Sequence, residues 1–139
     1  MHRPLLIASA ATVIPFALYL FAVGMWASSA ALALALFAVV AYSAPPLRFK
    51  EVPVLDSVTS SAHFTLPAVV GALIGDGSIG GYLGLTLAAF VLWGMAGHAL
   101  GAVQDVQSDR AGGLRSVATE LGARLTTRSA STLYLAAAT

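Results

Sequence analysis

Residues 4–47 read PLLIASAATVIPFALYLFAVGMWASSAALALALFAVVAYSAPPL, and none of them is acidic or basic. A membrane-spanning helix needs about 20 mostly apolar residues, so this stretch can cross a bilayer twice. Residues 57–75 and 77–104 are also free of charge, and 129–139 begins a further apolar run. The sequence therefore predicts an all-α fold, a polytopic transmembrane helical bundle. The spans are expected near 5–23, 25–42, 58–75 and 81–100, with the start of a fifth.

The composition agrees with a membrane protein. Of the 139 residues, 58% are hydrophobic and only 9% are charged, whereas a soluble domain has about 25% charged residues. The chain contains no cysteine, which excludes disulfide and thiol chemistry. We expect an integral, multi-pass protein of the cell membrane that contacts the lipid bilayer and binds no nucleic acid.

The seven Lys and Arg residues of the chain all fall on one side of the predicted spans. They are Arg3, Arg48, Lys50, Arg110, Arg115, Arg124 and Arg128. The turns expected near residue 24 and at 76–78 carry no base. Because basic loops remain on the cytoplasmic side of a membrane, the charged loops are predicted to be cytoplasmic.

Two carboxylates, Asp105 and Asp109, stand at the end of the fourth predicted span, in the stretch QDVQSD at 104–109. On a helix, residues four apart lie on one face, where two like charges repel each other unless a cation lies between them. Mg²⁺ prefers oxygen ligands and is typically held by one or two carboxylates together with substrate phosphates. The pair therefore predicts a Mg²⁺ site. The alternative is a solvated loop in which Asp109 pairs with a nearby arginine, Arg110 or Arg115.

Two bases, Arg48 and Lys50, follow the prolines in the stretch YSAPPLRFKE at 42–51. Adjacent prolines favour an extended backbone, which predicts a stiff arm that presents both bases near the membrane surface. Arginine can bind phosphate oxygens through two hydrogen bonds, and lysine can act as a point charge. The alternative is that both residues only fix topology or contact lipid headgroups.

One face of the third predicted span is polar over about its first two turns, and such a face usually points into a bundle interior or a cavity. Its residues are Asp56, Thr59, Ser60, His63 and Pro67. Asp56 and Ser57 are predicted to cap the N-terminus of that helix. His63 and, in the fourth span, His98 could bind a ligand or carry protons, although interhelical hydrogen bonds are the commoner role of such histidines.

Small residues indicate where helices should pack closely or end. Glycines four residues apart predict close helix contacts. They are Gly71 and Gly75 in the third span, and Gly97 and Gly101 in the fourth. Glycines 112–113 are expected to end the fourth helix, and 114–125 to form a short amphipathic helix at the membrane surface.

Several of these stretches resemble motifs of one family. YSAPPLRFK, residues 42–50, resembles the Y-x-x-P-P-x-R-x-K signature between the fourth and fifth helices of UbiA-type membrane prenyltransferases. DVQSD at 105–109, followed by glycines 112–113 and SVATELG at 116–122, resembles the second aspartate-rich motif of that family and its downstream helix. LDSVTSSAHF at 55–64 and GAVQD at 101–105 are most similar to the carotenoid branch, the lycopene elongases.

The resemblance implies a function and roles for residues. The reaction would be Mg²⁺-dependent transfer of a prenyl group from an allylic prenyl diphosphate to a lipophilic acceptor, such as the carotenoid lycopene. By analogy, Asp105 and Asp109 hold Mg²⁺, and Arg48 and Lys50 bind the diphosphate; these four are the expected catalytic residues. The residues expected to line the substrate site are Tyr42, Asp56, His63 and Gln104.

The resemblance also predicts that 1–139 is a partial domain. The family has about nine helices and two aspartate-rich loops, and the first of these loops has no counterpart here. We therefore expect a fragment that runs from the third helix into the seventh and is inactive alone. The residues are also compatible with a different class of function. The alternative is a non-enzymatic membrane scaffold or part of a transporter, in which the polar third span lines a pathway.

Overall fold

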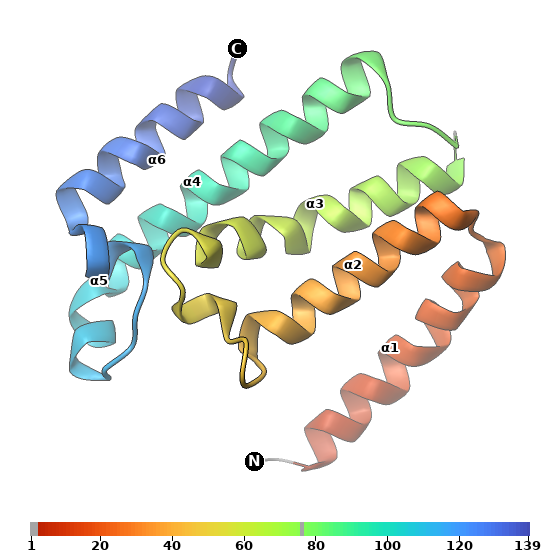
Figure 1. Ribbon diagram of the computed structural model, residues 1–139, viewed down its shortest axis with the longest axis horizontal. Coiled ribbons are helices and arrows are strands. Elements are labelled where there is room, and N and C mark those ends of the chain that lie inside the picture. The colour runs from red at the N-terminus through yellow and green to blue at the C-terminus, as the bar shows by residue number, and fades with distance from the viewer. Residues whose placement is uncertain (1–2, 76) are drawn as a thin grey trace.

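A computed structural model describes residues 3–75 and 77–139. Its elements are α1 (Arg3–Val23), α2 (Trp26–Ser43), the 3₁₀ turn η1 (Phe49–Glu51), α3 (Leu55–Gly75), α4 (Gly81–Ala111), α5 (Val117–Leu121) and α6 (Ala123–Ala137). The four longest helices and α6 lie side by side in one antiparallel layer, in which each contacts its neighbour (Figure 1). No strand occurs among the described residues, so the all-α prediction is confirmed.

Four helices, α1 to α4, are long and apolar enough to cross a membrane. A helix satisfies its backbone polar groups internally, which is what a segment in lipid requires. Most of their ends lie within a few residues of the predicted spans, but α4 continues to Ala111 rather than to about 100. Its 31 residues make it about 46 Å long, against about 30 Å for the hydrocarbon core. The C-terminal part of α4 therefore extends beyond the core.

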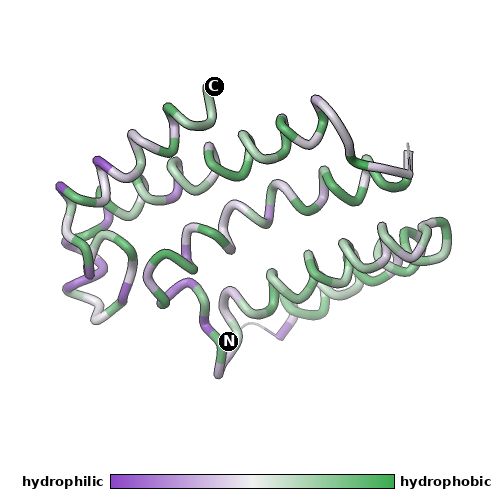
Figure 2. The backbone as a smooth tube through the Cα atoms, turned by 45° about the horizontal axis from the view of Figure 1, so that its top comes forward, coloured by the Kyte–Doolittle hydropathy of each residue, from purple (hydrophilic) through white to green (hydrophobic). Residues whose placement is uncertain are grey.

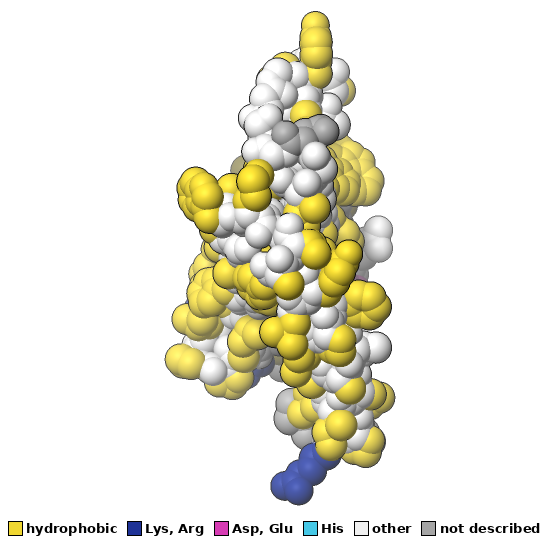
Figure 3. Space-filling view, turned by 90° about the vertical axis from the view of Figure 1, so that its right-hand side faces the viewer, with side chains coloured by type: hydrophobic (Ala, Val, Ile, Leu, Met, Phe, Trp, Pro, Cys, Tyr) yellow, Lys and Arg dark blue, Asp and Glu magenta, His cyan; other side chains and the backbone are white. Residues whose placement is uncertain are grey.

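The two ends of the layer differ in charge. Hydrophilic residues gather at the end formed by η1, α5 and the C-terminus of α4 (Figure 2), which is called the charged end below. The opposite end, called the uncharged end below after its described residues, carries the turns at 24–25 and 77–80. The described side chains there are mainly apolar and uncharged (Figure 3). There Trp26 and Tyr82 are 84% and 90% exposed, as expected of aromatic residues at a membrane interface. The predicted separation of the bases to one side is confirmed.

Helices α3 and α4 approach each other closely at Ser61 and Gly94. The Ser61 hydroxyl of α3 donates a hydrogen bond to the carbonyl oxygen of Val91 in α4, over 2.8 Å. A Cβ atom added at Gly94 would lie 2.6 Å from the Ser61 Oγ. Gly94 is therefore the glycine that lets these two helices pack together.

The predicted four-residue glycine pairs make no close helix contact among the described residues. An added Cβ at Gly71, Gly75 or Gly101 would meet no described atom within 4 Å. At Gly97 it would lie 3.5 Å from the Tyr134 hydroxyl, an ordinary contact. Among the described helices, the prediction that these pairs mediate close packing is therefore wrong, because the contact of α4 with α3 runs through Gly94 instead.

The segment after α4 also departs from the prediction. The expected single helix at 114–125 is wrong, because the chain is irregular at 114–116, forms α5, and breaks again at Gly122. Gly122 has a φ of 80°, a left-handed conformation that glycine adopts without a Cβ penalty. After it α6 begins and returns along α4, where the buried residues of the two helices and α5 form a small-residue core. That core contains Ala96, Ala99, Ala102, Val117, Ala118 and Ala130.

The prediction of an extended arm after α2 is likewise wrong. The backbone N–H of Arg48 donates to the carbonyl oxygen of Ala44 over 3.1 Å, so the chain turns back on itself through the two prolines. The 3₁₀ turn η1 then places Lys50 and Glu51 next to the layer. This compact turn, rather than a stiff arm, positions the basic residues.

Candidate functional site

A cavity of about 280 Å³ lies at the charged end, between α2, η1, α4 and the loop after α4. Its charged lining residues are Lys50, Glu51, Asp105, Asp109 and Arg115. Its other polar lining residues are Tyr42, His98 and Ser116. Three acidic groups thus face two basic ones, and this excess of negative charge favours binding of a cation.

Helix α4 supplies the acidic side of the cavity. His98, Ala102, Asp105 and Asp109 all line it, at the three- and four-residue spacing of one helical face. Asp105 is exposed and Asp109 is half-buried. Both carboxylates lie on the part of α4 that extends beyond the hydrocarbon core, where water can reach them.

The loop after α4 closes the cavity from another side. The N–H of Leu114 donates to the carbonyl oxygen of Asp109 over 2.8 Å, and Gly113 adopts a left-handed φ of 67°. This C-cap reverses the chain and brings residues 115–116 back over α4. Arg115 Nε then donates to the Glu120 carboxylate over 2.9 Å.

Ser116 fixes the start of α5. Its hydroxyl accepts a hydrogen bond from the N–H of Thr119 over 3.3 Å, and the Thr119 hydroxyl accepts one from the N–H of Ser116 over 2.8 Å. This reciprocal capping box satisfies donors that a helix start leaves unpaired. The loop that carries Arg115 is therefore held between two capped helix ends.

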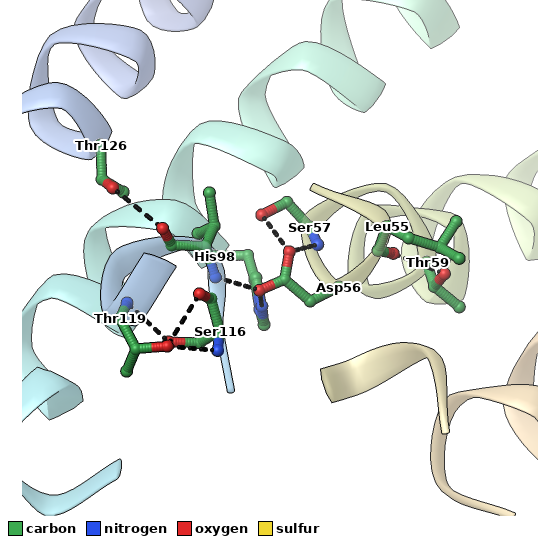
Figure 4. A network of polar contacts seen from close by, with 9 residues as sticks. Leu55, Asp56, Ser57, Thr59, His98, Ser116, Thr119 and Thr126 are labelled. Atoms are coloured by element: carbon green, nitrogen blue, oxygen red, sulfur yellow. Dashed lines mark hydrogen bonds and ion pairs between the residues drawn. The ribbon is translucent and has the colours of Figure 1, made fainter. Parts of the chain in front are cut away.

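A buried carboxylate, Asp56, connects α3, α4 and α5 behind the cavity (Figure 4). It is 0% exposed. Its Oδ1 accepts hydrogen bonds from the N–H and the hydroxyl of Ser57, over 2.5 and 3.1 Å. Its Oδ2 accepts one from the N–H of Val117 over 2.8 Å and lies 3.8 Å from His98 Nε2. The predicted cap of α3 thus lies inside that helix, which begins at Leu55. The Asp56 carboxylate also accepts a hydrogen bond from the first N–H group of α5.

The chemistry of the cavity fits a magnesium ion. Asp105 and Asp109 provide two oxygen-donor groups on one face, and no cluster of three or more potential metal-ligating side chains occurs in the described residues. Mg²⁺ commonly takes one or two protein carboxylates and completes its shell with water and phosphate oxygens. Lys50 and Arg115 line the same cavity and can contact such phosphates.

Of the eight site residues predicted from the sequence, the structure brings four together in the cavity. They are Tyr42, Lys50, Asp105 and Asp109. The other four lie outside its lining. Arg48 forms an ion pair with Glu51, which does line the cavity. His63 packs its ring edge-on against Tyr42, with 5.1 Å between centroids. Asp56 lies behind His98, and Gln104 is exposed on α4.

Four polar lining residues, Glu51, His98, Arg115 and Ser116, are missing from the predicted site. Arg115 and Ser116 follow the glycines 112–113, and a chain reversal at that point was the available signal. His98 shares a helical face with Asp105, which the sequence showed, but its place beside Asp56 depends on a contact between two helices.

Comparison with known proteins identifies the family of the chain. The sequence profile described as the UbiA prenyltransferase family matches residues 2–139. The chain belongs to this family. No solved structure matches it.

Among the relatives in this family is a lycopene elongase/hydratase of Corynebacterium glutamicum, which is 53% identical over 137 residues, 99% of this chain and 48% of the relative. The C(50) beta-cyclic carotenoids biosynthesis protein LbtBC of Dietzia is 52% identical over 98% of this chain and 32% of its own length. A lycopene elongase/hydratase of Haloferax volcanii is 43% identical over 65% of this chain and 29% of its own length. The chain thus spans about half the length of the Corynebacterium relative and about a third of the Dietzia relative.

Proposed function

We propose that the protein transfers a prenyl group from an allylic prenyl diphosphate to a hydrophobic acceptor, a carotenoid such as lycopene, in a Mg²⁺-dependent reaction. The observation that carries the proposal is the cavity at the charged end, where two carboxylates of α4 face Lys50 and Arg115. The names of the relatives support a carotenoid acceptor. Family membership favours this enzyme over the scaffold or transporter alternative.

The residues of the proposed site divide into two groups, metal ligands and phosphate ligands. Asp105 and Asp109 would hold Mg²⁺, and the bound ion supplies positive charge that stabilises the leaving diphosphate. Lys50 contacts the phosphates as a point charge, and Arg48, paired with Glu51 beside the cavity, is the proposed second phosphate ligand. These groups act where negative charge develops as the diphosphate leaves.

The position of the site suits a substrate with a polar diphosphate, an apolar prenyl tail and an apolar acceptor. The diphosphate lies at the charged end, where α4 leaves the hydrocarbon core. The prenyl tail and the acceptor occupy the apolar depth of the bilayer, where little water is present to react with an allylic cation. Tyr42, next to the C-terminal residue of α2, lies on the cavity wall, with His63 packed against it.

We place the charged end in the cytoplasm and the protein in the cell membrane. The support is that the described bases, Arg3 among them, lie at one end of the layer, which the positive-inside rule assigns to the cytoplasm.

The test of the proposed reaction is carotenoid profiling. The intact gene is expressed in cells that make lycopene and dimethylallyl diphosphate, and the extracted carotenoids are separated and weighed by mass spectrometry. We expect products extended by a five-carbon unit, with or without added water. Unchanged lycopene in cells whose membranes contain the protein would contradict the proposal.

A further inference from the structure

His98 lines the same cavity as the acidic pair but lies deeper in the membrane. It shares a face of α4 with Asp105 and precedes it by about two turns, which is about 10 Å along the helix axis. Its side chain is 23% exposed. A substrate with its diphosphate beside Asp105 and Asp109 would therefore have its first carbon atoms near the imidazole.

The imidazole is backed by a fixed carboxylate. Asp56 Oδ2 lies 3.8 Å from His98 Nε2, and the carboxylate is held by the N–H groups of Ser57 and Val117. At 3.8 Å the carboxylate is beyond hydrogen-bond distance, but its negative charge favours the tautomer that carries its proton on Nε2, which leaves Nδ1 to accept a proton. It also stabilises the imidazolium that forms when Nδ1 accepts a proton, as the aspartate does in a catalytic triad.

The proposed reaction needs such a base. The C–O bond to the diphosphate breaks, and its electron pair leaves with the diphosphate. The π electrons of the acceptor's terminal double bond then form the new C–C bond, which leaves a tertiary cation on the acceptor. The cation must lose a proton or take up water before the product can leave.

We propose that His98 is the base that ends this reaction, with Asp56 as its positioning residue; the inference rests on the proposed prenyl transfer. In one outcome, the electron pair of a C–H bond beside the cation forms a new double bond, and the proton moves to Nδ1. In the other, a water oxygen bonds to the cationic carbon, and one proton of that water moves to Nδ1. The imidazolium then releases the proton to water at the charged end of the cavity.

The other groups that face the cavity are less suited to this step. Lys50 and Arg115 are cations, and Asp105 and Asp109 are assigned to the metal. Glu51 of η1 is paired with Arg48. Tyr42 of α2 carries a phenol, which is neutral at neutral pH. His98 is therefore the group best placed to accept a proton at the depth where the cation forms.

The test is His98→Gln in the intact gene product, assayed in membranes with dimethylallyl diphosphate and lycopene in ¹⁸O-labelled water. Glutamine retains polarity and approximate size but does not accept a proton at neutral pH. We expect kcat to fall about tenfold or more, while the KM for dimethylallyl diphosphate stays within about threefold. We also expect the ratio of labelled hydrated product to unsaturated product to change. Asp56→Asn should change that ratio in the same direction but less.

Ser61→Ala is the matched control, because it removes a partly buried hydrogen bond between α3 and α4 outside the cavity. A wild-type kcat and product ratio in His98→Gln would overturn the inference. A second result would also overturn it: His98→Gln loses activity only as far as its protein level falls or its KM for dimethylallyl diphosphate rises, and its product ratio stays unchanged, as in Ser61→Ala. That result would indicate a structural role for His98. A wild-type protein that forms no prenylated carotenoid contradicts the proposed function itself, and the inference falls with it.

Discussion

The charged and uncharged ends of the helical layer are built in different ways. At the uncharged end, short turns join the helices, and no ion pair is found there among the described residues. At the charged end, Arg48–Glu51 and Arg115–Glu120 form ion pairs, His98 lies 3.8 Å from the buried Asp56 carboxylate, and two capped helix ends meet. An unpaired polar group in lipid costs several kcal/mol. Polar structure, and with it the proposed chemistry, is therefore concentrated where α4 leaves the hydrocarbon core.

The most complete test of the difference between the two ends is to determine which side of the membrane each end faces. The chain has no cysteine, so single cysteines can be labelled in intact cells with an impermeant maleimide. We expect Ser78→Cys, at the uncharged end, to be labelled, and Ser43→Cys and Ser108→Cys, at the charged end, to react only after the cells are opened. All three serines are exposed. The reverse pattern would place the proposed site on the outer face.

The largest effect on activity is expected at the acidic pair. Asp105→Asn or Asp109→Asn removes a carboxylate with little change in size and should lower kcat/KM by about two orders of magnitude or more, as losing a main electrostatic group does. Steady-state rates with increasing Mg²⁺ measure this. Glu120→Gln is the matched control at the same end, and we expect it to retain near-normal turnover. Near-normal turnover in both Asp→Asn variants would instead identify the pair as a solvated helix end.

A smaller effect is expected for Arg48. Its loss in Arg48→Ala should raise the KM for the prenyl diphosphate by about tenfold or more, because a hydrogen bond to a charged group contributes about 1.5–3 kcal/mol. Arg128→Ala removes one positive charge from an exposed position on α6 and serves as the control for overall charge. Equal KM values in the two variants would show that Arg48 only pairs with Glu51.

Substitutions at the contact of α3 with α4 should change the stability of the protein rather than its activity. Gly94→Ala places a Cβ atom against Ser61 and should destabilise the protein by about 1–3 kcal/mol. Gly71→Ala, where the added Cβ meets no described atom within 4 Å, should be neutral or slightly stabilising because alanine favours the helix. Thermal unfolding in detergent compares the two. Equal melting temperatures would contradict the described packing of these helices.

The smallest effect is expected for an exposed ion pair at the charged end. Arg115 and Glu120 have side chains that are 63% and 41% exposed. Exposed pairs contribute about 0–1 kcal/mol, so Glu120→Gln should change the melting temperature little, and less at high salt. A large loss of stability would show that the loop after α4 depends on this pair more than on Ser116.

Some of this architecture could be predicted from the sequence because its causes are local. A run of apolar residues without charge has few alternatives to a membrane helix, and the spacing of Asp105 and Asp109 places them on one face at once. The break at Gly122 has a local cause too, the positive φ of this glycine, although one continuous helix was predicted over 114–125. Arg48 and Asp56 could not be placed, because one depends on a turn closed by Ala44 and the other on contacts with α4 and α5. Neither the turn nor the contacts between helices produce a periodic pattern in the sequence.

The hydrogen bond from the N–H of Val117 to Asp56 joins residues 61 positions apart, which has a consequence for the order of folding during synthesis. When α3 emerges from the ribosome, the segment that will satisfy its carboxylate has not been made. The start of α3 must then stay hydrated at the membrane surface until α4 has been inserted and α5 has docked. Assembly of the charged end is therefore a late step in biogenesis, and a nascent chain that stops before residue 117 should leave Asp56 accessible to water.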